Sequence, residues 1–165
     1  MAENVDLPGV YRIEARDEAI LAFRGEHGYL SNFYRSPVEV EGQECATVEH
    51  AFQMLKTLDP ATREAIRLKA NPQWAKQATR AKSFVTREGW GDMRVGVMRE
   101  LVTQKFVRHP RLAAKLASTG DRPIIELNTW SDFFWGMVEQ DGQLVGENHL
   151  GIILMEVRGI VTSAA

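Results

Sequence analysis

The sequence has a single cysteine, Cys45, and no long hydrophobic run. One cysteine excludes an internal disulfide and is typical of a protein from a reducing compartment. No uninterrupted apolar stretch approaches the roughly 20 residues that a membrane-spanning helix needs. Residues 1–8 carry acidic side chains where a signal peptide would carry a basic end and an apolar core. We therefore expect a soluble, cytoplasmic protein with no membrane partner.

Motifs for metals and nucleotide cofactors are also lacking. The histidines are scattered, without the Cys/His spacing of a zinc site, and no Gly-x-Gly-x-x-Gly or P-loop spacing occurs. We expect neither a metal nor a cofactor. Cys45 and His50 are conceivable as a nucleophile and its base. A lone cysteine before a helix is more often structural, so we reject that pair.

No strong excess of one charge is present either. The formal net charge of −2 gives no global positive field for tight non-specific nucleic-acid binding, although a local basic patch can suffice. The chain of 165 residues shows no internal repeat, low-complexity tract or linker. These features predict one domain over residues 1–165.

Capping and breaking residues divide most of the chain into helices. Thr47, Asp59-Pro60 and Asn71-Pro72 are typical helix starts. Helices are expected over residues 48–58, 61–70, 71–82, 91–106, 111–118 and 148–157. Strands are expected within 11–23, 38–40, 43–46, 124–128 and around 138, and residues 25–37 are expected to be a structured loop. The predicted fold class is α+β, a predominantly helical single domain with short strands.

One face of the helix after Thr47 carries a first candidate site. Glu49, Gln53 and Lys56 follow one another at i, i+4 and i+7, which places them on the same face. The plainer interpretation is a solvated stripe. A carboxylate can instead stabilise the oxocarbenium-like state of glycoside cleavage. A partly desolvated lysine can attack an anomeric carbon or its aldehyde form.

Two further segments combine polar and aromatic side chains. Ser31 and Asn32 bring short hydrogen-bonding groups to a glycine-led loop that Phe33 anchors, although an ordinary turn explains these residues as well. Asp132 lies among the rings of the segment 130–136, which can stack on a base or pack in the core. We assign Trp130 and Phe133 to the core at even odds. Asp132 among rings should need a partner or a raised pKa.

The segment 146–151 is the fourth candidate. Asn148 is expected to cap the helix that follows, and free N–H groups at a helix start can bind phosphate. Capping alone also explains Asn148 without a function.

Taken together, these segments resemble the NADAR, or YbiA-like, domain family over residues 23–158. The resemblance lies in Phe23, Leu30-Ser31-Asn32-Phe33, Glu49-His50, Gln53, Lys56, Ala75-Lys76, Arg80, Trp90, Met98, Lys105-Phe106, Thr119-Gly120, Asp132-x-x-Trp135-Gly136, Gly146-x-Asn148-x-Leu150-Gly151 and Leu154–Arg158. Thr79 departs from the family, which usually has glycine there, and Leu144 stands where some members carry tryptophan.

The resemblance implies a largely helical α+β fold and N-glycosidase activity. One family branch hydrolyses phosphorylated ribosylamino-pyrimidines of riboflavin synthesis, and another removes ADP-ribose from guanine bases in nucleic acid, paired with an ADP-ribosyltransferase toxin. Glu49, Lys56 and Asp132 are the expected catalytic residues. The expected substrate-binding residues are Ser31, Asn32, Phe33, Gln53, Arg80, Trp90, Trp135, Gly136 and Asn148.

A different function remains open beside this one. A non-catalytic module that binds ADP-ribose or an NAD derivative would use the same pocket without hydrolysis. Three ionisable groups favour catalysis, since a binding module needs fewer of them. The slightly acidic net charge favours a small-molecule substrate over nucleic acid.

Overall fold

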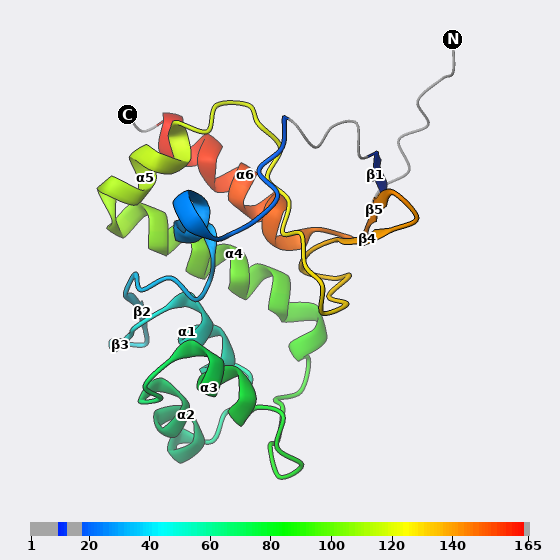
Figure 1. The fold of residues 1–165 in the computed structure, drawn as a ribbon. Helices are drawn as coiled ribbons and strands as arrows, with labels where there is room; N and C mark the ends of the chain where they lie inside the picture. Colours follow the sequence, from blue (N-terminus) through cyan, green and yellow to red (C-terminus); the bar gives the residue numbers. More distant parts are fainter. Residues whose placement is uncertain (1–9, 13–17, 164–165) are drawn as a thin grey trace. The chain divides into compact units, whose positions relative to one another are not determined.

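The computed structural model describes residues 10–12 and 18–163 of the chain (Figure 1). Its helices are η2 (Gly25–Leu30, a 3-10 helix), α1 (Val48–Met54), α2 (Pro60–Arg67), α3 (Pro72–Ala78), α4 (Trp90–Arg108), α5 (Pro110–Ala117) and α6 (His149–Ser163). Its strands are β1 (Val10–Arg12), β2 (Val38–Val40), β3 (Gln43–Cys45), β4 (Val138–Gln140) and β5 (Gln143–Val145). Helices joined by short antiparallel strands confirm the α+β prediction.

The chain divides into two compact units. One unit is residues 31–114, and the other combines residues 1–30 with residues 115–165, so that the second boundary falls inside α5. The expectation of one domain over residues 1–165 stays a prediction. No helix in the described part of the chain has the length and apolarity needed to cross a membrane.

In the 31–114 unit, α1 packs against α2, α3, α4 and the hairpin of β2 and β3. Every side chain of α1 is buried. The hairpin pairs Val38 with Cys45 across a two-residue turn, as the sequence predicts. Glu41 and Gly42 both have positive φ in this turn, at 52° and 77°, as a tight type I′ hairpin turn requires. A helix buried on all sides must satisfy its polar side chains within the protein.

The helix starts in this unit follow the capping residues. The Thr47 hydroxyl accepts a hydrogen bond from the His50 amide at 3.3 Å, and the Asp59 carboxylate accepts one from the Thr62 amide at 2.8 Å. Asn71 caps α3 in the same way through the Trp74 amide at 2.9 Å. These bonds satisfy amides that a helix leaves free in its first turn, so the predicted starts are confirmed.

The predicted helix ends are wrong in this unit. Helix α1 stops at Met54 rather than at residue 58, because the amides of Lys56 and Thr57 bond three residues back, to Gln53 and Met54. Such short bonds tighten and end a helix. Helix α3 ends at Ala78, four residues before the expected limit of about 82.

The other unit contains an antiparallel sheet in the order β1-β5-β4 and the helix α6. Ala19, Ile125, Met137 and Leu144 form a buried cluster there. Strands β4 and β5 were not predicted as a hairpin, although Asp141-Gly142 is a strong turn signal between them. Asp141 and Gly142 have φ of 49° and 79°, which matches the type I′ turn.

Three other predictions of local structure need correction. Residues 25–37 are not loop throughout, since η2 occupies the first part. Residues 124–128 form no strand; they contribute only the isolated bridges Ile20 to Ile124 and Leu127 to Met137. Within 11–23, strand β1 covers the beginning, and residues 13–17 lie outside the described residues.

Candidate active site

The residues predicted for the site are distributed over both units. Those in the 31–114 unit are Ser31, Asn32, Phe33, Glu49, Gln53, Lys56, Arg80 and Trp90. Those in the other unit are Asp132, Trp135, Gly136 and Asn148. Each group has its own geometry.

Glu49 and Gln53 are not part of a solvated stripe. Glu49 is 6% exposed and Gln53 is 3% exposed, so both are buried polar groups on α1. The Gln53 amide nitrogen donates to the Glu49 carboxylate at 2.6 Å, and the Gln53 carbonyl oxygen accepts from the Thr79 hydroxyl at 2.8 Å. Thr79 therefore fixes the amide that holds the carboxylate. A buried carboxylate with a fixed orientation is suited to react or to stabilise charge.

Lys56 lies in a partly buried position beside charged groups of both signs. Burial lowers the pKa of Lys56, and Glu49 acts in the opposite direction by favouring the ammonium form. The positive charges of Lys76, Arg80 and Arg94 lower the pKa of Lys56 further. One carboxylate and four cationic side chains thus act on the same small region. Such a cluster can attract phosphate groups, and the lowered pKa increases the share of neutral amine.

Aromatic rings line this region. The Trp90 ring, at the start of α4, lies 5.1 Å from the Phe52 ring at an angle of 56°. The Lys56 ammonium lies 5.5 Å from the centre of the Phe52 ring, and the Lys76 ammonium lies 5.9 Å from that of Phe33. Phe33 is 37% exposed, so part of this ring faces solvent. The rings provide apolar surface beside the charged groups.

The loop of Ser31, Asn32 and Phe33 is tied to the start of α1. The Glu49 amide donates to the Asn32 carbonyl at 3.1 Å, which places Asn32 next to the candidate carboxylate. The Asn32 side-chain nitrogen donates to the Met98 sulfur at 3.3 Å. Its side-chain oxygen is buried and has no hydrogen-bond partner in the described part of the chain. A native structure seldom leaves such an atom unpaired without a reason, and a substrate hydroxyl would satisfy it.

Lys105 was not predicted as a site residue, although it supports this loop. It is 1% exposed, and its ammonium donates to the Ser31 carbonyl at 2.8 Å. Burial lowers the pKa of Lys105 to about 7. The sequence carried a signal, because Lys105 follows Met98 at i+7 on the apolar face of α4, where a charged residue is unusual. Lys105, on α4, therefore positions the Ser31–Phe33 loop through this bond.

In the other unit, Asp132 organises the aromatic loop. Its Oδ1 accepts hydrogen bonds from the amides of Phe134 at 3.2 Å and Trp135 at 2.9 Å. Asn128 completes the turn, since it accepts from the Asp132 amide at 3.0 Å and donates to the Asp132 carbonyl at 2.8 Å. The expected partners of Asp132 are therefore backbone amides. Oδ2 of Asp132 is not used by these bonds.

The aromatic rings of this loop divide into two groups. The rings of Phe134 and Trp135 meet at 5.0 Å and 90°, and the His149 ring lies 4.4 Å from that of Phe134. Trp130 is 62% exposed and Phe133 is 37% exposed. The assignment of Trp130 and Phe133 to the core is therefore wrong. Exposed rings on a loop fixed by Asp132 are available for stacking.

The glycines and the asparagine of the last motif hold backbone segments together. Asn148 is the residue before α6, yet its side chain does not cap the helix as expected. Its Oδ1 accepts from the Glu126 amide and its Nδ2 donates to the Ile124 carbonyl, each at 3.0 Å. A Cβ atom on Gly136 would collide with the Glu126 carbonyl, and one on Gly151 with the Ile124 carbonyl. This geometry gives Asn148 a structural role, and its substrate-binding role stays a prediction.

The rejected nucleophile pair has no support in the geometry. Cys45 is fully buried, and burial raises the pKa of its thiol to about 11, which disfavours the reactive thiolate. The His50 ring uses one nitrogen at 2.9 Å from the Thr47 hydroxyl and the other at 3.0 Å from the Lys69 carbonyl. Both ring nitrogens are therefore committed to structural bonds.

Known proteins are similar to this chain in sequence and in fold. The family model described as the NADAR domain matches residues 22–161. N-glycosidase YbiA of Escherichia coli K12 is 37% identical over 133 residues, which are 81% of this chain and 81% of that protein. An N-glycosidase of Nostoc punctiforme is 34% identical over 135 residues, covering 80% of this chain and 84% of the relative.

Two further similarities concern a longer relative and a solved structure. A riboflavin biosynthesis protein of Vibrio vulnificus is 36% identical over 80% of this chain, which corresponds to 35% of that protein. The NMR structure of E. coli YbiA aligns with a TM-score of 0.75 and 31% identity, over 96% of this chain and 91% of that one.

Proposed function

This chain belongs to the NADAR domain family, and we propose that it is an N-glycosidase that hydrolyses the bond between a ribose C1 and a base amine. The observation that carries the proposal is the buried Glu49 carboxylate, held by Gln53 on α1, with the partly buried Lys56 just beyond the end of that helix. The N-glycosidase names of two relatives support the same reaction class. A catalytic pair with fixed geometry is more than a binding module requires.

The negative charge of the Glu49 carboxylate supports cleavage of the C1–N bond. As the bond breaks, positive charge develops on C1 and the ring oxygen, and a nearby carboxylate stabilises it. The neutral amine of Lys56 then adds to C1, and the base amine departs with a proton. The bond from Gln53 keeps the Glu49 oxygen in place during these steps, so little reorganisation is needed.

Lys56 contributes as an amine. Burial and three neighbouring cations lower the pKa of Lys56, which makes the neutral form more available near neutral pH. A neutral amine that adds to C1 in place of the base amine forms a Schiff base with the ring-opened sugar; water then hydrolyses this Schiff base, which releases the sugar and restores the Lys56 amine. In this proposal Lys56 is the nucleophile, and Glu49 stabilises the charge that forms.

Asp132 is the second carboxylate of the proposal, assigned through its place in the family motif with Trp135 and Gly136. Two bonds from backbone amides use Oδ1 and hold the carboxylate in place, while Oδ2 takes no part in them. Trp90, whose ring packs on Phe52 beside Lys56, is proposed to cover the sugar or the base.

The substrate class follows from the cations around Lys56. Lys76, Arg80 and Arg94 suit a ribose that carries phosphate. Ribosylamino-pyrimidine phosphates and ADP-ribosylated guanine both meet this requirement. The name of the Vibrio vulnificus relative supports the first of them. Ser31 and Asn32 are proposed to hold ribose hydroxyls, since the Asn32 side-chain oxygen is unpaired.

The substrate is tested by incubating the purified protein with two compounds in parallel. One is a ribosylamino-pyrimidine phosphate, and the other is an oligonucleotide with ADP-ribosylated guanine; mass spectrometry follows the released base and sugar. Release from either compound supports an N-glycosidase and identifies its branch. Binding measured by calorimetry with no product from either would contradict the proposal and favour a non-catalytic ADP-ribose or NAD-derivative binding module.

A further inference from the structure

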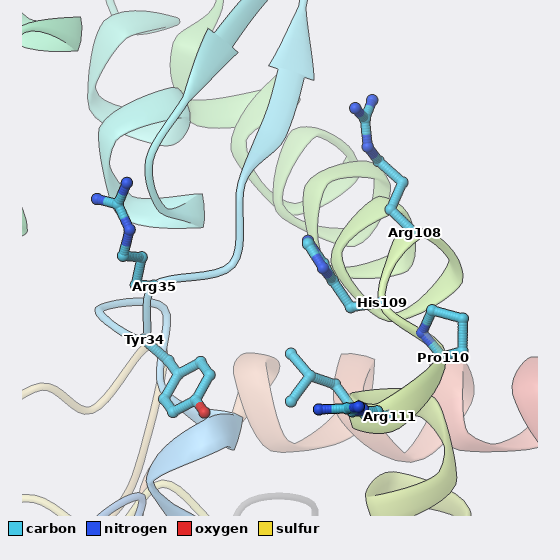
Figure 2. A pocket seen from close by; sticks show the side chains of 7 residues that line it. Tyr34, Arg35, Arg108, His109, Pro110 and Arg111 are labelled. Carbon is cyan, nitrogen blue, oxygen red and sulfur yellow. The ribbon is translucent and has the colours of Figure 1, made fainter.

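A pocket in the 31–114 unit shares a loop with the candidate active site, since its lining residue Tyr34 directly follows Phe33. It has a volume of about 500 Å³, is open to solvent, and is lined by Tyr34, Arg35, Arg108, His109, Pro110, Arg111 and Leu112. Figure 2 shows Tyr34 and Arg35 on one side and Arg108, His109, Pro110 and Arg111 on the other. None of these residues is acidic. The pocket therefore forms a basic groove, although the whole chain has a net charge of −2.

The charges of the basic groove are largely uncompensated. Arg35 and Arg111 form no hydrogen bond or ion pair in the described part of the chain. Arg108 pairs with Glu39 at 3.2 Å, but both side chains are more than a third exposed, where such a pair contributes little. The His109 ring donates to the Pro37 carbonyl at 2.9 Å, which fixes its position in the wall. Guanidinium groups without partners suit phosphate oxygens.

The arrangement of these groups favours an extended ligand. The arginines lie on both walls of an open groove, so no single phosphate is surrounded by them. The Tyr34 ring is 41% exposed in the same groove and offers a surface for an aromatic base. Arginines that follow a backbone, with an aromatic ring for stacking, are the usual means of binding single-stranded nucleic acid.

We propose that the basic groove binds single-stranded nucleic acid, with backbone phosphates on Arg35, Arg108 and Arg111 and a base on Tyr34. The groove and the candidate active site share a loop, since Tyr34 directly follows Ser31–Phe33. The buried Lys105 links them, because its ammonium contacts the Ser31 carbonyl at 2.8 Å and lies 5.6 Å from the Tyr34 ring centre. Nucleic acid in the groove would therefore lie next to the candidate active site. The inference does not depend on the proposed hydrolysis, because binding needs no scissile bond.

The test measures binding of an unmodified strand by fluorescence anisotropy, over a range of salt concentrations. The probe is a fluorescein-labelled oligothymidylate of about ten nucleotides, within the usual length for one such groove. The variant R35A/R111A should bind at least about tenfold more weakly, and its slope of log affinity against log salt should fall by about 1.4, since two phosphate contacts to a single strand are lost. A wild-type midpoint of unfolding confirms that the variant is folded.

Matched variants separate the groove from general charge. R24A/K69A removes the same charge from exposed positions outside the groove and should leave the slope unchanged. Tyr34→Ala should weaken binding without changing the slope, and Tyr34→Phe should restore it. Equal losses in both double variants, or none in R35A/R111A, would overturn the proposal. Competition by inorganic phosphate or thymidine monophosphate as strong as by the oligonucleotide would overturn it in favour of a single-phosphate site.

Failure of this proposal is distinguishable from failure of the proposed function. Glu49→Gln should abolish turnover and leave oligothymidylate binding unchanged. If the groove fails to bind while the wild-type protein still hydrolyses a ribosylamino-pyrimidine phosphate, only the nucleic-acid inference is wrong.

Discussion

Gln53, one turn after Glu49 on α1, donates a hydrogen bond from its side-chain amide to the Glu49 carboxylate at 2.6 Å. The side-chain carbonyl of Gln53 accepts a hydrogen bond from the Thr79 hydroxyl at 2.8 Å. This chain of bonds keeps a buried carboxylate oriented. It connects the cap of α3, where Thr79 lies, to Glu49 on α1.

Removing the donor should impair catalysis more than stability. Gln53→Leu is expected to lower kcat/KM by roughly ten- to a hundredfold, since a hydrogen bond to a charged group is worth about 1.5–3 kcal/mol. Thr79→Val removes only the outer bond and should show a smaller loss of kcat/KM. Equal losses in the two variants would contradict the role of Gln53.

Lys105 should make stability rise with pH. Burial lowers its pKa in the folded chain to about 7, whereas the value is 10.5 without burial. Between these values the unfolded chain binds a proton that the folded chain has released, so the free energy of unfolding rises with pH over that range. Below about pH 7 both states are protonated and the full cost of burying the ammonium remains.

Urea unfolding of the wild type and Lys105→Met at several pH values measures this contribution. The wild type should gain stability relative to Lys105→Met as the pH rises from about 7 towards 10.5. Lys82→Met changes an exposed lysine and should follow the wild type. A constant difference between the wild type and Lys105→Met would show that Lys105 is not held as a buried amine.

Two glycines of α6 should respond in opposite ways to alanine. A Cβ on Gly151 would collide with the Ile124 carbonyl and with the Asn148 side chain, whereas one on Gly159 meets nothing within 4 Å. Gly151→Ala should therefore destabilise the protein by roughly 1–3 kcal/mol or more through overpacking. Gly159→Ala should stabilise it by about 0.5–1 kcal/mol through helix propensity. Thermal unfolding of both variants tests the close approach of α6 to residue 124.

The amine role of Lys56 can be tested by trapping. Sodium borohydride reduces a Schiff base to a stable secondary amine, so substrate plus borohydride should inactivate the wild type and add the mass of the sugar to a peptide that contains Lys56. Lys56→Met should show no adduct, and Lys76→Met, a neighbouring cation, should still form it. Adduct on another lysine, or none with an active enzyme, would exclude Lys56 as the nucleophile.

Much of the local structure could be predicted because its causes are local. Thr47 and Asn71 start their helices through bonds to amides three residues away, and the spacing of Glu49 and Gln53 follows from helix geometry, whereas Lys56 lies past the end of α1. The hairpin at Asp141-Gly142 carried an equally local signal that the interpretation overlooked. Local signals therefore identified the face of α1 that carries the candidate site.

The remaining features depend on partners distant in sequence. Glu49 is buried because α1 packs against several helices. The sequence of α1 alone does not predict that packing. Asn148 was expected to cap α6. Its side chain instead bonds to Ile124 and Glu126, which are 24 and 22 residues away in the sequence. Lys105 supports a loop 74 residues earlier in the chain. Single-sequence patterns do not specify such contacts.

The most direct test of the proposal compares the wild type with Glu49→Gln on a phosphorylated ribosylamine substrate. The two side chains have nearly the same shape, and the amide can still bond to Gln53, so the variant should keep its fold and its substrate affinity. Single-turnover release of the base should fall by at least about a hundredfold, as expected when a catalytic carboxylate is lost. Release at the wild-type rate by a folded Glu49→Gln protein would remove Glu49 from the mechanism and contradict the proposed function of the α1 site.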